Sequence, residues 1–197
     1  MLDSQPCLRR KLFIVLLGDD NHGKSKLLQK LAEFGSKHQK SYPRAIKHLK
    51  LYCGNAVVDT YIFRSSYQES PSLAGHYNKD IERAIRDKIG EDWFTKDLVI
   101  MPFRCECGSK INSVNLARRL IDFAHSYGFD VIVAYIILDS DELKKKNCCR
   151  DILKLNWDKR WELYNPRISQ DDKSKIQEQC EYLAVVLLQR ICSELKC

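Results

Sequence analysis

The sequence lacks any apolar run long enough to cross a membrane. The longest one, Val131 to Leu138, is far shorter than the roughly 20 residues that a membrane-spanning helix needs. The first ten residues lack the apolar core of a secretory signal, and internal repeats and low-complexity stretches are missing as well. These absences predict a cytoplasmic protein. The length of 197 residues predicts one domain of ordinary size.

A spacing typical of metal sites is also missing among the nine cysteines. The closest pairs, Cys105-Glu106-Cys107 and Cys148-Cys149, lack the two-residue spacing of a zinc knuckle. Because the number of cysteines is odd and the chain is not small, we expect reduced thiols rather than disulfides. A structural zinc site at these two pairs is the less favoured alternative.

The sequence also lacks dense runs of arginine and lysine with aromatic residues between them. Such runs are typical of a surface that binds along nucleic acid. The formal net charge of +7 is moderate and is compatible with an anionic ligand. Nucleic acid is therefore not indicated as a partner, although the charge permits such contacts.

The most informative stretch is Gly18-x-x-x-x-Gly23-Lys24-Ser25, which follows the apolar run 11–17 and precedes a helical pattern. Glycines let the backbone adopt conformations that other residues avoid, so successive N–H groups can point at an anion. The helix that starts at Lys24 adds its unpaired N–H groups and the positive end of its dipole. The spacing therefore predicts a phosphate-binding loop between a strand and a helix.

This stretch resembles the P-loop NTPase superfamily. The resemblance implies a doubly wound α/β fold, in which helices sandwich a mostly parallel sheet, and Mg²⁺-dependent binding of a nucleoside triphosphate. It also implies that Lys24 reaches the β- and γ-phosphates and that the Ser25 hydroxyl binds Mg²⁺. The candidate nucleotide-binding residues are Gly18, Asn21, His22, Gly23, Lys24, Ser25 and Lys26.

The apolar periodicity predicts alternating helices and strands, the signature of an α/β fold. We divide the chain into a lead-in (1–10), a nucleotide-binding core (11–140) and a C-terminal helical part packed on the core (141–197). The segment around Trp157 to Pro166 is expected to be irregular. The expected helices are Lys24 to Gly35, Asn78 to Ile89, Asn112 or Ser113 to Gly128, Glu142 to Leu155, and Ser174 to Leu195. The expected strands are Lys11 to Leu17, Ile46 to Cys53 and Ala56 to Phe63 in a hairpin, Leu98 to Met101 ended by Pro102, and Phe129 to Leu138.

A P-loop site also needs a carboxylate near the metal, usually at the end of a neighbouring strand. Two aspartates, Asp59 and Asp139, follow apolar runs. In kinase-like and GTPase-like members of the superfamily, the strand beside the loop strand comes early in the sequence, which favours Asp59. We therefore predict Lys24 and Asp59 as catalytic residues, and Ser25, Asp59 and Asp139 as candidate Mg²⁺ ligands. A role in starting a turn stays open for either aspartate.

The segment around Asp59 supports two comparisons within the superfamily. The stretch from Val58 to Gln68 is similar to the Asp-Arg-Tyr stretch of thymidylate and deoxynucleoside kinases, but Thr60 stands in place of the arginine. Small GTPases carry Asp-x-x-Gly-Gln-Glu at this place in the chain, and Gln68 and Glu69 alone match it. The base-reading signature Asn-Lys-x-Asp of GTPases does not occur, so we expect ATP rather than GTP.

These observations predict a small NTPase that binds Mg²⁺ and ATP and hydrolyses the nucleotide. One alternative is a phosphotransferase acting on a nucleoside or another small metabolite, in which Arg150, Arg160 and Arg167 could form a lid. The same segment could instead be a packed corner around Trp157 and Trp161. A further alternative is a nucleotide-binding switch or scaffold that acts through a protein partner without turnover.

Overall fold

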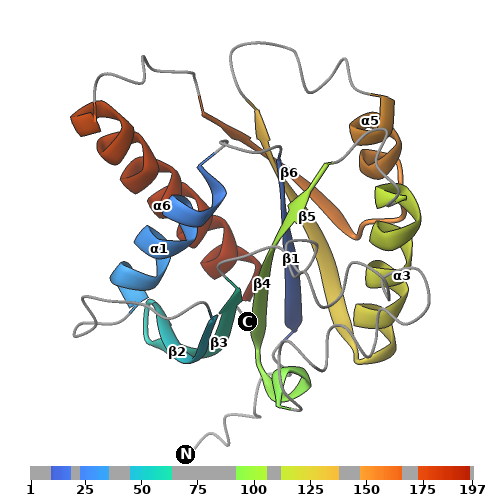
Figure 1. Ribbon diagram of the computed structural model, residues 1–197. Coiled ribbons are helices and arrows are strands. Elements are labelled where there is room, and N and C mark those ends of the chain that lie inside the picture. Colours follow the sequence, from blue (N-terminus) through green and yellow to red (C-terminus); the bar gives the residue numbers. More distant parts are fainter. Residues whose placement is uncertain are drawn as a thin grey trace, which may run out of the picture.

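Six strands form one sheet in the computed structural model, in the order β2-β3-β4-β1-β5-β6 (Figure 1). The central strand β1 (Lys11–Gly18) runs parallel to both of its neighbours, β4 (Leu98–Arg104) and β5 (Phe129–Ile137). Further out, β3 (Ala56–Phe63) is parallel to β4, and β6 (Lys159–Tyr164) is parallel to β5. The hairpin strand β2 (Ala45–Cys53) is antiparallel to β3. The structure describes residues 10–18, 23–35, 45–63, 92–105, 112–137, 147–165 and 173–195.

Helices cover both faces of the sheet, which explains why the central strands are apolar on both sides. On one face lie α1 (Lys24–Gly35) and α6 (Lys173–Leu195), and on the other lie α3 (Ser113–Ser126) and α5 (Asn147–Leu153) (Figure 1). None of the helices that the structure describes is long and apolar enough to cross a membrane. Side chains of β1 alternate between the two cores, with Phe13, Val15 and Leu17 toward α3 and Leu12, Ile14 and Leu16 toward α1 and α6. The described residues therefore form an α/β fold with a mostly parallel sheet.

Three local sequence signals correspond to observed caps and turns. The Asn112 side chain accepts a hydrogen bond from the Asn115 N–H (3.0 Å) and caps the N-terminus of α3. Gly128 (φ 76°) follows the end of α3, and Gly54 (φ 63°) lies in the hairpin turn between β2 and β3. Residues with a Cβ avoid this left-handed region, so both glycines are required by the backbone conformation. The predicted start and end of α3 and the predicted hairpin are confirmed.

One predicted strand boundary is wrong, and one strand was not predicted. Strand β4 does not end at Pro102 but continues to Arg104. Its described ladder with β3 ends at Ile100, and a proline without an N–H is tolerated where one side of a strand is unpaired. Residues 159–164, expected to be irregular, form β6. Within the predicted helix 142–155 the structure describes α5, and the predicted helix 78–89 lies outside the described residues.

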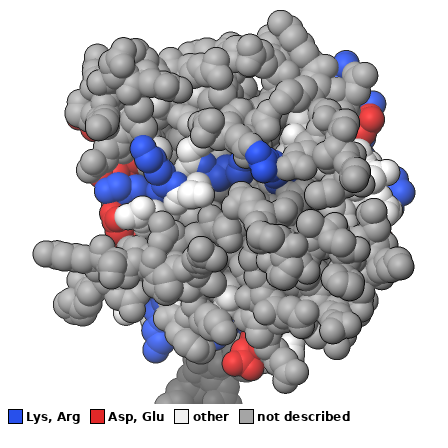
Figure 2. Space-filling model, viewed as in Figure 1, with Lys and Arg blue, Asp and Glu red and all other residues white. Residues whose placement is uncertain are grey.

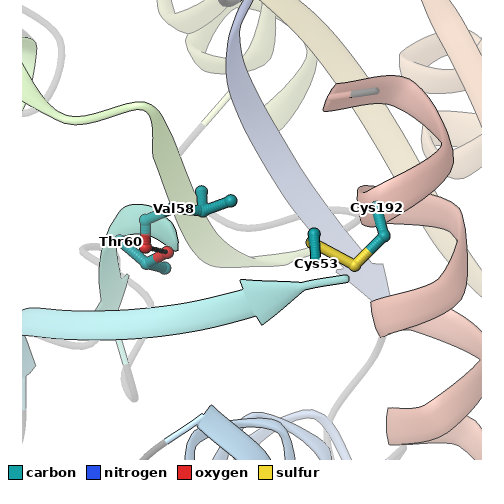
Figure 3. The surroundings of a disulfide bond; sticks show 4 residues. All are labelled: Cys53, Val58, Thr60 and Cys192. Carbon is teal, nitrogen blue, oxygen red and sulfur yellow. Dashed lines mark hydrogen bonds between the residues drawn. A yellow bond between two sulfur atoms is a disulfide. The ribbon is translucent and has the colours of Figure 1, made fainter. Parts of the chain in front are cut away.

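Two disulfides join segments that are far apart in the sequence, contrary to our expectation of reduced thiols. Cys53, at the end of β2, is bonded to Cys192 on α6 across 139 residues (Figure 3). Cys105, which follows β4, is bonded to Cys149 on α5 across 44 residues. The sulfurs of Cys105 and Cys149 are therefore joined in a disulfide and do not act as zinc thiolates. Cys180 is a buried free thiol.

Candidate functional site

The candidate site lies where β1 ends at Gly18 in the middle of the sheet and α1 begins at Lys24. The chain leaves β1 toward the face that carries α1. The strands on either side, β4 and β5, are followed by α3 and α5 on the opposite face. In open α/β sheets, ligands bind outside the carboxyl ends of the strands at such a divergence. Residues 19–22, among them the predicted Asn21 and His22, lie outside the described residues.

Gly23 forms the turn into α1. Its φ of 79° lies in the left-handed region, and its carbonyl accepts the first hydrogen bond of the helix from the Leu27 N–H (2.8 Å). A Cβ added to Gly23 would lie 3.6 Å from Nδ2 of Asn165 and 3.9 Å from Sγ of Cys180, which are ordinary contact distances. The backbone conformation, and not a lack of space, therefore requires glycine at this position.

Lys24 is the buried cation of the site. The residue is 9% exposed, and its Nζ donates a hydrogen bond to the carbonyl oxygen of Gly18 (2.7 Å). The side chain thus reaches from the first turn of α1 back to the last residue of β1 and spans both ends of segment 19–22. Burying a charge is costly unless it is hydrogen-bonded and paired, and the Gly18 carbonyl supplies one acceptor. Lys24 therefore joins Gly18, the last residue of β1, to the start of α1, directly after Gly23.

Further positive charge gathers at this edge of the sheet. Ser25 and Lys26 are exposed in the first turn of α1, where helix N–H groups lack intrahelical acceptors. Arg104, the last residue of β4, is the register partner of Gly18 and is half-buried. Figure 2 shows a band of lysine and arginine side chains across this part of the surface, with acidic side chains at its left end. Sequence reasoning missed Arg104 because it placed the wrong strand beside β1.

Asp59 lies near the opposite edge of the sheet. Its neighbour Thr60 is level with Leu98, the first residue of β4, whereas Gly18 is level with Arg104, the last one. Six residues of strand separate these two levels, which corresponds to about 20 Å. The structure therefore does not bring Asp59 to Lys24, and the proposal below leaves it out.

The contacts of Asp59 are those of a structural residue. Its Oδ2 accepts a hydrogen bond from Nζ of Lys96 (2.8 Å), and the Lys96 side chain is 6% exposed. The Asp59 N–H donates to Oδ2 of Asp97 (2.9 Å), and the Asp97 N–H donates to the Asp59 carbonyl (3.0 Å). These bonds join the middle of β3 to the start of β4.

The metal ligands predicted from the sequence are placed in part. Ser25 is at the start of α1, as predicted, while Asp139 lies outside the described residues. The strand next to β1 is β4, and the first carboxylate after it in the sequence, Glu106, is outside the described residues too. In the part of the chain that the structure describes, no three His, Cys, Asp or Glu side chains form a group that could hold a metal ion.

The segment with two tryptophans is a packed corner. Trp157 is buried in the core under α3 and α5, and its Nε1 donates to the Ile152 carbonyl (2.8 Å). Trp161 is buried in the other core, with residues of α6. Arg160 donates to the carbonyl of Leu155 (3.1 Å), at the end of the sheet away from Gly18. The packed-corner alternative is confirmed by this burial, and Arg167 lies outside the described residues.

No protein-family model matches the chain, and no curated protein matches it.

Proposed function

We propose that this chain belongs to the P-loop NTPase superfamily and binds a nucleoside triphosphate, ATP rather than GTP, at the loop between β1 and α1. The observation that carries the proposal is the hydrogen bond from Lys24 to the Gly18 carbonyl, which holds a buried ammonium across the loop. An ammonium in this place neutralises an anion that the loop N–H groups bind. The two residues that make this contact, Gly18 and Lys24, both belong to the Gly18-x4-Gly23-Lys24-Ser25 motif of the sequence.

Each described residue has one task in the proposed complex. Lys24 supplies a positive charge to the phosphate chain, which lysine binds as a point charge. Gly23, through its positive φ, orients the peptide groups that precede α1. The first turn of α1 adds unpaired N–H groups and the positive end of the helix dipole. Arg104 adds a further cation at the level of Gly18.

Mg²⁺ fits the described part of the site through the Ser25 hydroxyl, an oxygen ligand at the start of α1. The ion keeps several waters in such sites and binds one or two protein groups together with the phosphates, so the chain needs to supply few ligands. Asp139 is the remaining candidate from the sequence. When bound, the ion neutralises charge on the phosphate oxygens.

Hydrolysis of the nucleotide is the second part of the proposal. Binding without turnover is the alternative function, and it is favoured by one observation: β1, β4 and β5 end in Gly18, Arg104 and Ile137, none of which is a carboxylate. A switch or scaffold needs the phosphate grip alone, whereas turnover also needs a group that orients the attacking water.

Calorimetric titration of the purified chain with ATP and GTP, with and without Mg²⁺, tests the binding step. We expect micromolar binding of MgATP, weaker binding of GTP, and a loss of affinity when Mg²⁺ is removed. Release of phosphate is then followed with and without a panel of nucleosides and other small acceptors. Phosphate release without an acceptor supports the NTPase, consumption of ATP that needs an acceptor supports the phosphotransferase, and binding without consumption supports the switch. A wild-type chain that binds neither nucleotide would remove the proposal.

A further inference from the structure

Asn165, the residue after β6, lies near Gly23, the residue before α1 in the proposed site. Asn165 follows the last residue of β6, and its N–H donates to the Ile137 carbonyl at the end of β5 (2.7 Å). This bond fixes the Asn165 backbone at the same edge of the sheet as Gly18. Asn165 is far from Gly23 in sequence but lies near it in space.

The side chain of Asn165 faces Gly23. Its Nδ2 lies 3.6 Å from the place where a Cβ of Gly23 would stand, and Sγ of the buried Cys180 on α6 lies 3.9 Å from the same place. The open side of Gly23, which has no side chain, is thus covered by one residue of the β6–α6 junction and one of α6. A glycine has a wide choice of conformations, and these two side chains limit the space into which this side of Gly23 can move.

We propose that Asn165 is a positioning residue for the phosphate loop: its amide packs against Gly23 and holds the left-handed turn that α1 starts from. The inference rests on the proposed function, because it concerns the loop that binds the nucleotide. The affinity of a ligand falls in proportion to the fraction of chains whose site is in the binding conformation. Removing the amide therefore lowers the affinity for ATP without removing any group that touches the phosphates.

Asn165→Ala tests the inference, with Asn156→Ala as the matched control. Asn156 is exposed and precedes β6 at the other end of the sheet. Calorimetry should give an affinity of Asn165→Ala for MgATP about three- to tenfold below that of the wild type, the range expected for the loss of one side-chain contact. The control should bind as the wild type does.

A spectroscopic readout separates positioning from a general loss of stability. The chain has eight glycines, so selective ¹⁵N-glycine labelling gives a spectrum in which the Gly23 signal can be assigned through Gly23→Ala. We expect the Gly23 signal to move in Asn165→Ala and to stay in Asn156→Ala, while the signals of Gly54 and Gly128 stay in both. If Asn165→Ala folds poorly, the milder Asn165→Ser is measured in the same way.

The outcomes are distinct. Weaker ATP binding together with a displaced Gly23 signal supports the inference. Unchanged affinity, or an unmoved Gly23 signal with weakened binding, overturns it while the proposed function stands. A wild-type chain that binds no nucleotide defeats the proposed function, and the inference with it.

Discussion

Removal of the Cys53–Cys192 disulfide should lower the stability of the protein by several kcal/mol. The bond joins the end of the β2–β3 hairpin to α6 across 139 residues (Figure 3). In the chain-entropy model, a cross-link that closes a loop of this length removes enough freedom from the unfolded chain to be worth about 5 kcal/mol. Measured disulfides mostly contribute about 2–4 kcal/mol, so we expect a loss in that range.

The double variant Cys53→Ala/Cys192→Ala measures this loss, with Cys180→Ala as the control for removing a buried sulfur. Cys180 is buried and unbonded, so its replacement removes packing but no cross-link. Urea unfolding without reductant gives the free energy of unfolding of each protein. Proteolytic peptides of the unreduced wild type should include one species that links Cys53 to Cys192.

Two results would refute this reasoning. One is a double variant as stable as the wild type once the Cys180→Ala effect is allowed for. The other is a wild type in which alkylation marks both Cys53 and Cys192 as free thiols. Disulfides are rare in cytosolic proteins, so the linked peptide would also count against the cytoplasmic location that we expected from the sequence.

Three other substitutions test contacts away from the loop. Asp59→Asn removes the negative charge that pairs with the buried Lys96; because the Asp59 side chain is 46% exposed, we expect a cost of about 1–2 kcal/mol in urea unfolding. Its ATP affinity should be unchanged, and a stable variant that loses ATP would return Asp59 to the site. Burial raises the pKa of Tyr61 to about 12, and its hydroxyl has no hydrogen-bond partner among the described residues. Tyr61→Phe should therefore leave the stability unchanged or raise it by up to about 1 kcal/mol. A clear loss of stability in thermal unfolding would contradict this. Burial alone would raise the pKa of Asp158, but hydrogen bonds from the Val131 N–H and His125 outweigh it and lower this pKa. Because the folded pKa lies below the unfolded one, this stabilisation is present above about pH 4 and is lost as the pH falls through the folded pKa; the acid loss of stability should therefore be smaller in Asp158→Asn than in the wild type.

The strand before residues 19–22 and the helix after them were predictable because the rules that place them are local. Glycine at a left-handed turn, a lysine at the first helical position and an apolar strand before them all act within a few residues, and the structure has them together. The cap of α3 at Asn112 and the turn at Gly54 follow from rules of the same range. Sequence reasoning is strongest where one turn of chain decides the conformation.

The order of the strands was not predictable in the same way. We placed the hairpin strand β3 beside β1, but β4 lies between them, and this choice depends on contacts between segments far apart in the chain. The misplaced strand is the reason that Asp59 was favoured over other carboxylates. The same limit applies to the disulfides, since sequence spacing does not show which cysteines meet.

Strand β6 was missed because it alternates. Trp161 and Leu163 face a core, while Arg160 and Glu162 are exposed, so the segment has no continuous apolar run. Edge strands carry charges in this way, and the pattern differs from that of the buried strand β5. Alternation over 159–164 is the signal that could have identified it.

The central claim, that Lys24 binds the phosphates of a nucleotide, is tested most directly by titrating MgATP into Lys24→Ala and into Lys50→Ala. Lys50 is an exposed lysine on β2, level with Asp59 and away from the loop. Loss of a charge-assisted contact to more than one oxygen predicts that Lys24→Ala binds at least about a hundredfold more weakly than the wild type. Lys50→Ala should keep the wild-type affinity, and both variants should unfold with the same cooperativity as the wild type. Equal affinities for MgATP in Lys24→Ala and in the wild type would contradict the account.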